Sequence, residues 1–329
     1  MPIVKRSIVD MIGHFAPFTD VLVNPVNCGG EERKGVMGAG VAKAFADTYP
    51  AMYEDYKRVC SKGELTIGTL HIYTDPESKI IIINFPTKRD WRDRSRVEDI
   101  EMGCIKLAEY LTQHPFYTVA MPALGTGLGK IDPVVAEDVF MQHLDPLPNI
   151  IHLSMRPDRF EHPPLYLGVV GSRAYTDYER IDLGVSDGLI EFALDYKDFS
   201  GLVSGGAGGV DSVACGSGRP GYNQPTLAKQ HGIKPIVCQA DWQRYSNNSA
   251  GFIRNRTVMD IATHVVAFVG KQSTGTRNLV ELVVKYNRKV DAYLQEMTIP
   301  SGWDVFRSPA KPIPVKKQLH ICDISSVCR

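Results

Sequence analysis

The sequence predicts two α/β domains in one chain. Its 329 residues exceed what one ordinary hydrophobic core needs and suit two domains of roughly 150 residues each. Short β-branched runs alternate with helical stretches in both halves, which is typical of buried parallel strands. The proline-bearing segment 161–164 separates the two series. We therefore expect a first domain at 1–160, a second at 165–293 and a C-terminal extension at 294–329.

The first series alternates strands with two helical stretches. Helices are expected at 38–60, starting near Val41, and at 97–114, where apolar residues recur at helical spacing. Strands are expected at 21–27 (VLVNPVN), 70–73 (LHIY), 79–86 (KIIIINFP), 117–124 (YTVAMPAL) and 149–160 (NIIHLSMRPDRF).

The second series repeats strand, glycine turn and helix. This is a Rossmann-like doubly wound pattern, in which ligands gather at the carboxyl ends of the strands. The tail from Met297 is rich in Pro, Lys and Ser and is expected to be irregular or partly docked. Strands are expected in LYLGVVGSR (165–173), GLVSGGAGGVDSVA (201–214), KPIVCQA (234–240) and HVVAFVG (264–270), and helices at 178–196, 226–231, 250–262 and 276–286.

Bulk composition excludes several classes of protein. Lys plus Arg and Asp plus Glu both total 37, so the net charge gives no whole-chain attraction to nucleic acid or membrane. The seven cysteines lack paired spacing, which argues against a disulfide framework or a metal site and favours a reducing compartment. Neither a signal-peptide apolar region nor a run of about 18 apolar residues occurs. We expect a cytoplasmic protein with no membrane partner.

Two glycine-rich loops are the main candidate for a ligand site. The first, 24–40 (NPVNCGGEERKGVMGAG), leaves a strand and enters a helix; the second, 121–132 (MPALGTGLGKID), follows another strand. Glycine lets backbone approach a ligand, and a helix N-terminus offers N–H groups to phosphate. Two such loops at one sheet edge clamp a diphosphate. The alternative is that the glycines only close tight turns, since one short glycine motif is a weak signal.

Four ordered blocks across about residues 1–155 resemble the macrodomain family: VNPVNCGGEERKGVMGAGVAKAF, GTLHIY, INFPTKRDWRDRSRVEDIE and AMPALGTGLGKID. The NFPTK element resembles the DarG-type branch, whose members remove ADP-ribose from thymidine in DNA. The resemblance implies a three-layer α/β/α fold that binds ADP-ribose and requires no cofactor. The pyrophosphate would lie between the two loops and the distal ribose near Asn27 and Lys88.

The resemblance also implies roles for single residues. A partly desolvated Lys88 can lose its proton and bond the aldehyde equivalent at ribose C1, while Asn27 orients the ribose. The alternative is that Lys88 only neutralises phosphate or is solvated. The expected ADP-ribose-binding residues are Asp10, Met11, Asn24, Gly35, Val36, Met37, Gly38, Gly40, Val41, Pro122, Ala123, Leu124, Gly125, Thr126, Gly127 and Leu128.

Two segments depart from the family pattern. Macrodomains usually begin with a compact turn whose acid holds the adenine amino group, but here VDMIGHFAPFTDVLVN carries an insertion. Asp10 is the expected acid and Asp20 the alternative. The charged segment 28–34 lengthens the first loop and is expected to reshape access to the distal ribose.

A local basic run follows the NFPTK element. Its five cations are expected to contact nucleic-acid phosphates, with Trp91 stacking on a base. The alternative is a solvated segment whose arginines pair with neighbouring carboxylates. Cys28, beside the site, is read as a small buried residue rather than a reactive thiol. The five cations are Lys88, Arg89, Arg92, Arg94 and Arg96.

The second half, over about 165–290, resembles the SLOG superfamily, in particular its small YspA-like group, through GSR, SGGAGGVD, ADW, AGFIRN and a GT-containing loop. Related hydrolases place a glutamate three residues after the threonine of GGxGT; here Leu279 stands there. This favours a sensor of a nucleotide or NAD-derived small molecule over a hydrolase, and a structural partner is the alternative. The expected nucleotide-binding residues are Gly171, Ser172, Arg173, Ser204, Gly205, Gly206, Gly209, Arg254, Asn255, Gly275 and Thr276.

The leading hypothesis is an ADP-ribosyl hydrolase acting on ADP-ribosylated DNA or protein, in a toxin, phage or defence context. A second hypothesis is a non-catalytic binder that sequesters ADP-ribose or a derived signal. A third is a hydrolase of small ADP-ribose derivatives. SLOG relatives often assemble through helices, so a homodimer is the expected assembly.

Overall fold

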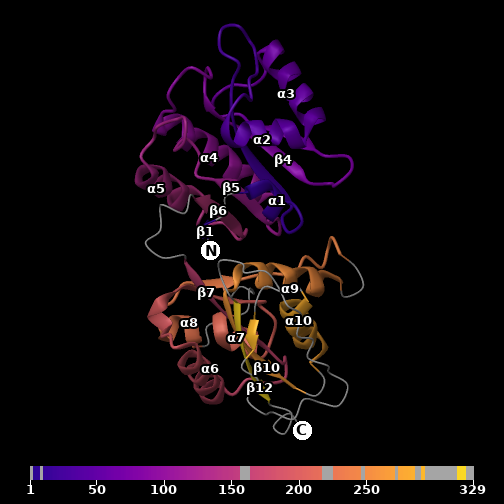
Figure 1. The fold of residues 1–329 in the computed structure, drawn as a ribbon, viewed down its shortest axis with the longest axis vertical. Helices are drawn as coiled ribbons and strands as arrows, with labels where there is room; N and C mark the ends of the chain where they lie inside the picture. Colours follow the sequence, from indigo (N-terminus) through magenta and orange to yellow (C-terminus); the bar gives the residue numbers. More distant parts are fainter. Residues whose placement is uncertain are drawn as a thin grey trace. The chain divides into compact units, whose positions relative to one another are not determined.

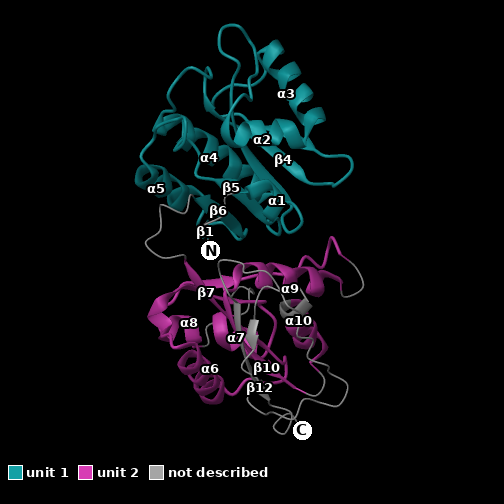
Figure 2. Ribbon diagram, viewed as in Figure 1, with its two compact units in different colours: residues 1–163 teal, residues 164–329 magenta. Residues whose placement is uncertain are grey.

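The structure is a computed structural model of the chain and describes residues 3–7, 10–155, 164–216, 225–245, 249–270, 273–285, 290–292 and 317–323. It divides into two compact units, residues 1–163 and 164–329 (Figure 2). Each unit contains a six-stranded sheet with helices packed on it (Figure 1). The α/β class predicted for both halves is confirmed.

The sheet of the first unit has the order β1-β6-β5-β2-β4-β3. Its strands are β1 (Ile3–Ser7), β2 (Val21–Asn27), β3 (His71–Thr74), β4 (Ile81–Lys88), β5 (Val119–Pro122) and β6 (Ile151–Met155). All pairs are parallel except β3 with β4. The carboxyl ends of β5, β2 and β4, three neighbours in the sheet, therefore open on the same edge.

Alternating side chains of β2 explain the three layers of this unit. Val21 and Val23 lie in the core under α4 (Val97–Thr112) and α5 (Pro133–His143), and Leu22 lies in the core on the opposite face. That opposite face is covered by α1 (Met11–Phe15), α2 (Gly40–Thr48) and α3 (Pro50–Lys62). Successive strand residues point to opposite faces, so one strand supplies both cores.

The predicted helix 38–60 is wrong in one respect, because the structure breaks it in two. Tyr49 ends α2 and precedes Pro50, the first residue of α3. A residue before proline is pushed out of the helical region, so a second helix begins at the proline. The predicted helix 97–114 is confirmed as α4, which runs from Val97 to Thr112.

The sheet of the second unit has the order β11-β12-β10-β7-β8-β9 and is parallel throughout. The strands are β7 (Leu165–Gly171), β8 (Phe199–Ser204), β9 (Pro235–Val237), β10 (His264–Val269), β11 (Val290–Ala292) and β12 (Lys317–Asp323). Chain order reverses between β7 and β10, the arrangement expected of a Rossmann-like fold. Of the two alternatives expected for the tail, irregular or partly docked, docking describes Lys317–Asp323, which forms a strand between β10 and β11.

The helices of the second unit are α6 (Tyr178–Phe192), α7 (Val210–Cys215), α8 (Leu227–Gln230), α9 (Ser249–Ile261) and α10 (Thr274–Lys285), with a short 3₁₀ turn, η2, at Tyr196–Asp198. The predicted helix 178–196 therefore ends early, at the left-handed Ala193. Tyr286, the predicted end of the last helix, lies outside the described residues. Within the described residues, no helix is both long and apolar enough to span a membrane.

Candidate functional site

One cleft in the first unit collects both glycine loops. The first loop follows β2, the second follows β5, and Lys88 ends β4. Because β5, β2 and β4 are neighbours, their carboxyl ends bring these three segments together. The cleft encloses about 2360 Å³, more than the roughly 300–1,000 Å³ of a usual small-molecule pocket.

Most of the predicted ADP-ribose residues line this cleft, along with the two predicted catalytic residues. They are Asp10, Met11, Asn27, Gly35, Val36, Gly38, Gly40, Val41, Lys88, Pro122, Ala123, Gly125, Thr126, Gly127 and Leu128. Arg33 and Lys34, from the charged segment expected to reshape access, also line it, and sequence reasoning missed the cations Lys57 and Lys130. Lys130 directly follows the second glycine loop, so its position next to GLG is the signal that could have identified it.

Three predicted ligand-binding residues are wrong as lining residues. Asn24 is fully buried, and its amide donates to Asn84 Oδ1 at 2.7 Å. Met37 and Leu124 are also buried in the core, on opposite faces of the sheet. Asn24 turns inward through the alternation of side chains along β2. Met37 and Leu124 lie in the two loops, where their apolar side chains pack into the two cores instead of facing the cleft.

Asn27 fixes the shape of the first loop. Its side-chain amide donates to the carbonyl of Val36 at 2.7 Å, and its side-chain oxygen accepts from the backbone N–H of Gly29 at 2.9 Å. Tyr56, from α3, donates its hydroxyl to the backbone carbonyl of Asn27 at 2.8 Å. Asn27 thus ties the two ends of the inserted segment 28–34 together. No linear pattern pointed to Tyr56, which is 29 residues away in sequence.

Lys88 reaches across the cleft to the second loop. Its Nζ donates to the carbonyl of Leu128 at 3.0 Å. Removal from water lowers the pKa of the Lys88 amine, and nearby Lys130 lowers it further, against an opposing effect of Asp93. The strand register explains the placement: Val26 pairs with Pro86 but Asn27 pairs with Lys88, so Thr87 is an extra residue. Such a bulge re-aims the side chain that follows it.

The glycines of the two loops divide into structural and open positions. A Cβ on Gly35 would lie 2.5 Å from Cε1 of Tyr56, and one on Gly129 would lie 2.3 Å from Ser95 Oγ, so packing requires both glycines. Gly127 has nothing within 4 Å of its Cβ position, and Gly38 meets only Val36, at 3.6 Å. The protein itself does not require glycine at 127 or 38, which leaves both backbones open to close approach by a ligand.

The start of α2 faces the same cleft. Residues 38–42 line it, and neither a side-chain cap nor an acidic residue occupies the first turn of the helix. The N-terminus of a nine-residue helix carries partial positive charge and unpaired N–H groups, which suits an anion.

Asp10 rather than Asp20 lies at the cleft. Asp10 caps α1, accepting from the backbone N–H of Gly13 at 2.9 Å, and lines the cleft. Asp20 instead accepts from the backbone N–H of Thr118 at 2.9 Å and braces the entry to β5. Cys28 is half-buried, less than the expected buried residue, and its partial removal from water raises its pKa to about 12.

The basic run after β4 divides into residues of different kinds. Arg89 makes a two-point ion pair with Asp99, which is buried in the first turn of α4. Arg92 pairs with Glu32 at 3.0 Å and with Asp90 at 3.4 Å. Arg94 and Arg96 are exposed. Phosphate contact by all five cations is therefore not supported, since Arg89 is committed to Asp99.

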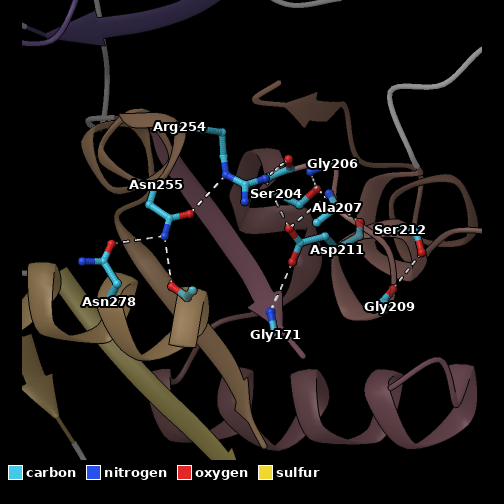
Figure 3. Close-up of polar contacts among 12 residues, drawn as sticks. Gly171, Ser204, Gly206, Ala207, Gly209, Asp211, Ser212, Arg254, Asn255 and Asn278 are labelled. Carbon is cyan, nitrogen blue, oxygen red and sulfur yellow. Dashed lines mark hydrogen bonds and ion pairs between the residues drawn. The ribbon is translucent and has the colours of Figure 1, made fainter. Parts of the chain in front are cut away.

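In the second unit, a buried ion pair organises the predicted nucleotide loops (Figure 3). Asp211 of α7 accepts from the backbone N–H groups of Gly171 (3.2 Å) and Ala207 (3.4 Å). Arg254 of α9 lies 3.8 Å from Asp211 and donates to the carbonyl of Gly205. These contacts join the ends of β7 and β8 to α9.

The same network corrects the roles predicted for several residues of this unit. Arg254 is committed to Asp211 and Gly205, and Asn255 donates to the carbonyl of Gly275 at 3.0 Å (Figure 3). Ser204, Gly205, Gly209 and Thr276 are buried. Their contacts are internal, so these residues shape the loops instead of facing a ligand. Gly171, Ser172, Arg173, Gly206 and Gly275 remain accessible to differing degrees.

Metal ligation has no support within the described ranges, where no group of three or more His, Cys, Asp or Glu side chains is placed to hold an ion.

Comparison with known proteins concerns the first unit. Residues 23–140 match the family model described as Macro domain. A DNA ADP-ribosyl glycohydrolase of Mycobacterium tuberculosis is 37% identical over 134 residues, which cover 40% of this chain and 37% of that protein. A DNA ADP-ribosyl glycohydrolase of Thermus aquaticus is 36% identical over 117 residues, covering 34% of this chain and 30% of that protein. The chain thus spans about a third of the length of the curated relatives it matches.

Two solved structures match the same region. The macrodomain of Mycobacterium tuberculosis DarG is 35% identical and covers 43% of this chain and 90% of that chain, with a TM-score of 0.36. The macrodomain of Thermus aquaticus DarG is 31% identical and covers 43% of this chain and 91% of that chain, with a TM-score of 0.38. Within the first unit, residues 23–140 therefore match the Macro domain family model, and nothing in these comparisons extends to the second unit.

Proposed function

We propose that the first unit is a glycohydrolase that removes ADP-ribose from DNA. The observation that carries the proposal is the Lys88 amine, partly withdrawn from water and held between two glycine loops in a cleft suited to a diphosphate. The names of the relatives, DNA ADP-ribosyl glycohydrolase, support the same reaction. In this proposal the diphosphate lies between Gly38 and Gly127, near the start of α2, and Asp10 accepts from the adenine amino group.

The reaction uses Lys88 as a nucleophile. Its neutral amine attacks C1 of the distal ribose, the bond from C1 to the base breaks, and the departing base takes the electron pair together with the proton lost by the amine. Water then cleaves the new C1–N bond, which returns the free amine and releases ADP-ribose. Asn27 contributes indirectly, since it holds the loop that faces the ribose.

The test is release of ADP-ribose from an ADP-ribosylated oligonucleotide and from an ADP-ribosylated protein. Lys88→Ala should reduce turnover of the DNA conjugate by about a thousandfold or more. Lys57→Ala is the matched control: Lys57 also lines the cleft, but it is paired with Glu54 at 2.6 Å on α3. Full activity in Lys88→Ala would refute the mechanism. Binding of ADP-ribose without turnover of any conjugate by the wild type would instead favour sequestration, and turnover of small esters alone would favour the small-molecule hydrolase.

We further propose that the second unit is a SLOG-type sensor of a nucleotide or NAD-derived molecule. Support comes from the loops after β7 and β8, which lie beside the point where the strand order reverses and are joined by the Asp211 to Arg254 pair. Calorimetry with AMP, NAD and ADP-ribose, using wild type and Arg173→Ala, tests this. Arg173 is exposed just after the end of β7, so loss of its guanidinium should weaken binding of a phosphate-bearing ligand by about tenfold. The substitutions Lys88→Ala and Gly127→Val remove the proposed site of the first unit, so any binding that remains belongs to the second unit. If this double variant binds none of the three compounds, the second unit is better explained as a structural partner of the first.

A further inference from the structure

Two large apolar side chains stand exposed in the cleft and have no part in the proposed chemistry. Trp91 is 50% exposed and Leu128 is 64% exposed, and both line the cleft. Other exposed apolar side chains of this unit, such as Val134 at 69%, do not line it. Exposure of large apolar groups inside a ligand cleft costs stability in water, so it calls for a partner in the bound state.

Both side chains belong to the end of the cleft that holds the amine. Leu128 carries the carbonyl that accepts from Lys88 Nζ at 3.0 Å. Trp91 follows Lys88 by three residues, on the turn after β4. Both residues therefore line the cleft near the amine, where the group bonded to the atom that Lys88 attacks would also lie.

The indole of Trp91 is held in place. The guanidinium of Arg92 lies over the ring, 4.7 Å from its centroid, and is itself paired with Glu32 and Asp90. The turn is closed by two further bonds, from the N–H of Arg92 to Asp90 Oδ1 at 2.9 Å and from the N–H of Asp90 to Asp93 Oδ2 at 3.1 Å. A preorganised ring loses little conformational entropy when a second planar group stacks on it.

We infer that Trp91 and Leu128 form a leaving-group subsite for the planar nucleobase that carries ADP-ribose. This inference rests on the proposed function and adds to it the residues that recognise the base. Stacking reads the face of a base and requires the base to be out of the duplex, because an aromatic side chain cannot reach the face of a stacked base. The charge of Arg92 is already partnered, so its contribution is to hold the indole rather than to bind phosphate.

The experiment separates the base from the ADP-ribose. In a Lys88→Ala background, which leaves the conjugate intact, binding of a thymidine-ADP-ribosylated single-stranded oligonucleotide is compared with binding of free ADP-ribose. Trp91→Ala should weaken binding of the conjugate by about tenfold to a hundredfold and leave the affinity for free ADP-ribose unchanged. Trp91→Phe should restore most of the loss. Leu128→Ala should weaken binding of the conjugate by about threefold to tenfold.

Matched controls are Val134→Ala, an exposed apolar residue outside the cleft, and Trp242→Ala, a 55% exposed tryptophan of the second unit; neither should change either affinity. The loss in Trp91→Ala should be the same at low and high salt, because stacking releases no counterions. Equal weakening of conjugate and free ADP-ribose, or no weakening of either, would overturn the subsite. If the wild type binds conjugates through Trp91 yet cleaves none, the subsite stands and the proposed reaction fails.

Discussion

Arg89 and Arg92 are three residues apart in the same basic run, yet their removal should have very different effects on stability. Arg89 makes two charge-assisted hydrogen bonds to Asp99, at 2.5 and 3.0 Å, and the Asp99 side chain is only 3% exposed. Arg92 is 54% exposed and pairs with Glu32, which is 59% exposed. Arg89→Ala leaves the buried carboxylate of Asp99 without its ion-pair partner. Arg92→Ala removes the partner of Glu32, which water can solvate instead.

The magnitudes follow from this burial. Breaking a fully buried pair costs roughly 3–5 kcal/mol. The Arg89 side chain is 51% exposed, and Asp99 is also stabilised by the N-terminus of α4, so the loss should be smaller, about 2 kcal/mol. For a domain of this size, that lowers the melting temperature of the first unit by about 4–8 °C. The exposed pair of Arg92 should contribute about 0–1 kcal/mol.

Urea unfolding of the full chain measures the difference. Replacing Trp242 and Trp303 with Phe leaves Trp91 as the fluorescent reporter of the first unit. Arg89→Lys, which keeps the charge but loses the two-point geometry, should fall between wild type and Arg89→Ala. Equal midpoints for Arg89→Ala and Arg92→Ala would refute the assignment of Arg89 as a structural brace.

Four further outcomes are expected. Gly127→Val should weaken ADP-ribose binding roughly tenfold or more in calorimetry without lowering the unfolding midpoint. Gly129→Val should instead destabilise the first unit by about 1–3 kcal/mol, because its Cβ would lie 2.3 Å from Ser95 Oγ, and a Gly129→Val protein of unchanged stability would contradict this. The kcat/KM for the DNA conjugate should rise with pH as the Lys88 amine deprotonates and should level off below the ordinary lysine pKa of 10.5, since burial lowers the Lys88 pKa; a rate that falls with pH would count against the nucleophile. Burial lowers the pKa of His264 from 6.5 to about 4, so on acidification the unfolded chain takes up the proton before the folded chain does. The free energy of unfolding of the second unit should therefore fall by about 3 kcal/mol between pH 6.5 and pH 4, and urea unfolding of His264→Phe should show no such loss. Arg94→Glu should weaken DNA binding and flatten its salt dependence, and an unchanged slope would exclude a phosphate contact there.

The order of strands and helices was predictable because it depends on local patterns. The run VLVNPVN alternates between two buried faces, and the four isoleucines of KIIIINFP form a continuous buried apolar run, as a strand covered on both sides should. The break at Tyr49 was readable from Pro50 but was overlooked. Strand β12 could not be predicted, because the segment that precedes it is long and its pairing with β10 depends on distant residues.

Site residues whose position depends on the backbone could be predicted from the sequence. Those whose role depends on the direction of the side chain could not. Gly38, Gly127 and Lys88 follow strand ends, so sheet topology alone brings them to one edge. Asn24 and Met37 lie within the same motifs, yet they turn into the core, and a linear motif contains no information on that choice. The commitment of Arg254 to Asp211 was equally hidden, because the partner is 43 residues away in sequence.

The register that pairs Asn27 with Lys88 has a consequence for redesign. Both residues are fixed by the hydrogen-bonded ladder of two adjacent strands, whereas Trp91 and Leu128 sit on turns beyond it. Turns of this kind are exchangeable, so transplanting them from a macrodomain should alter which conjugates are accepted while the Lys88 amine and the loop held by Asn27 keep their places.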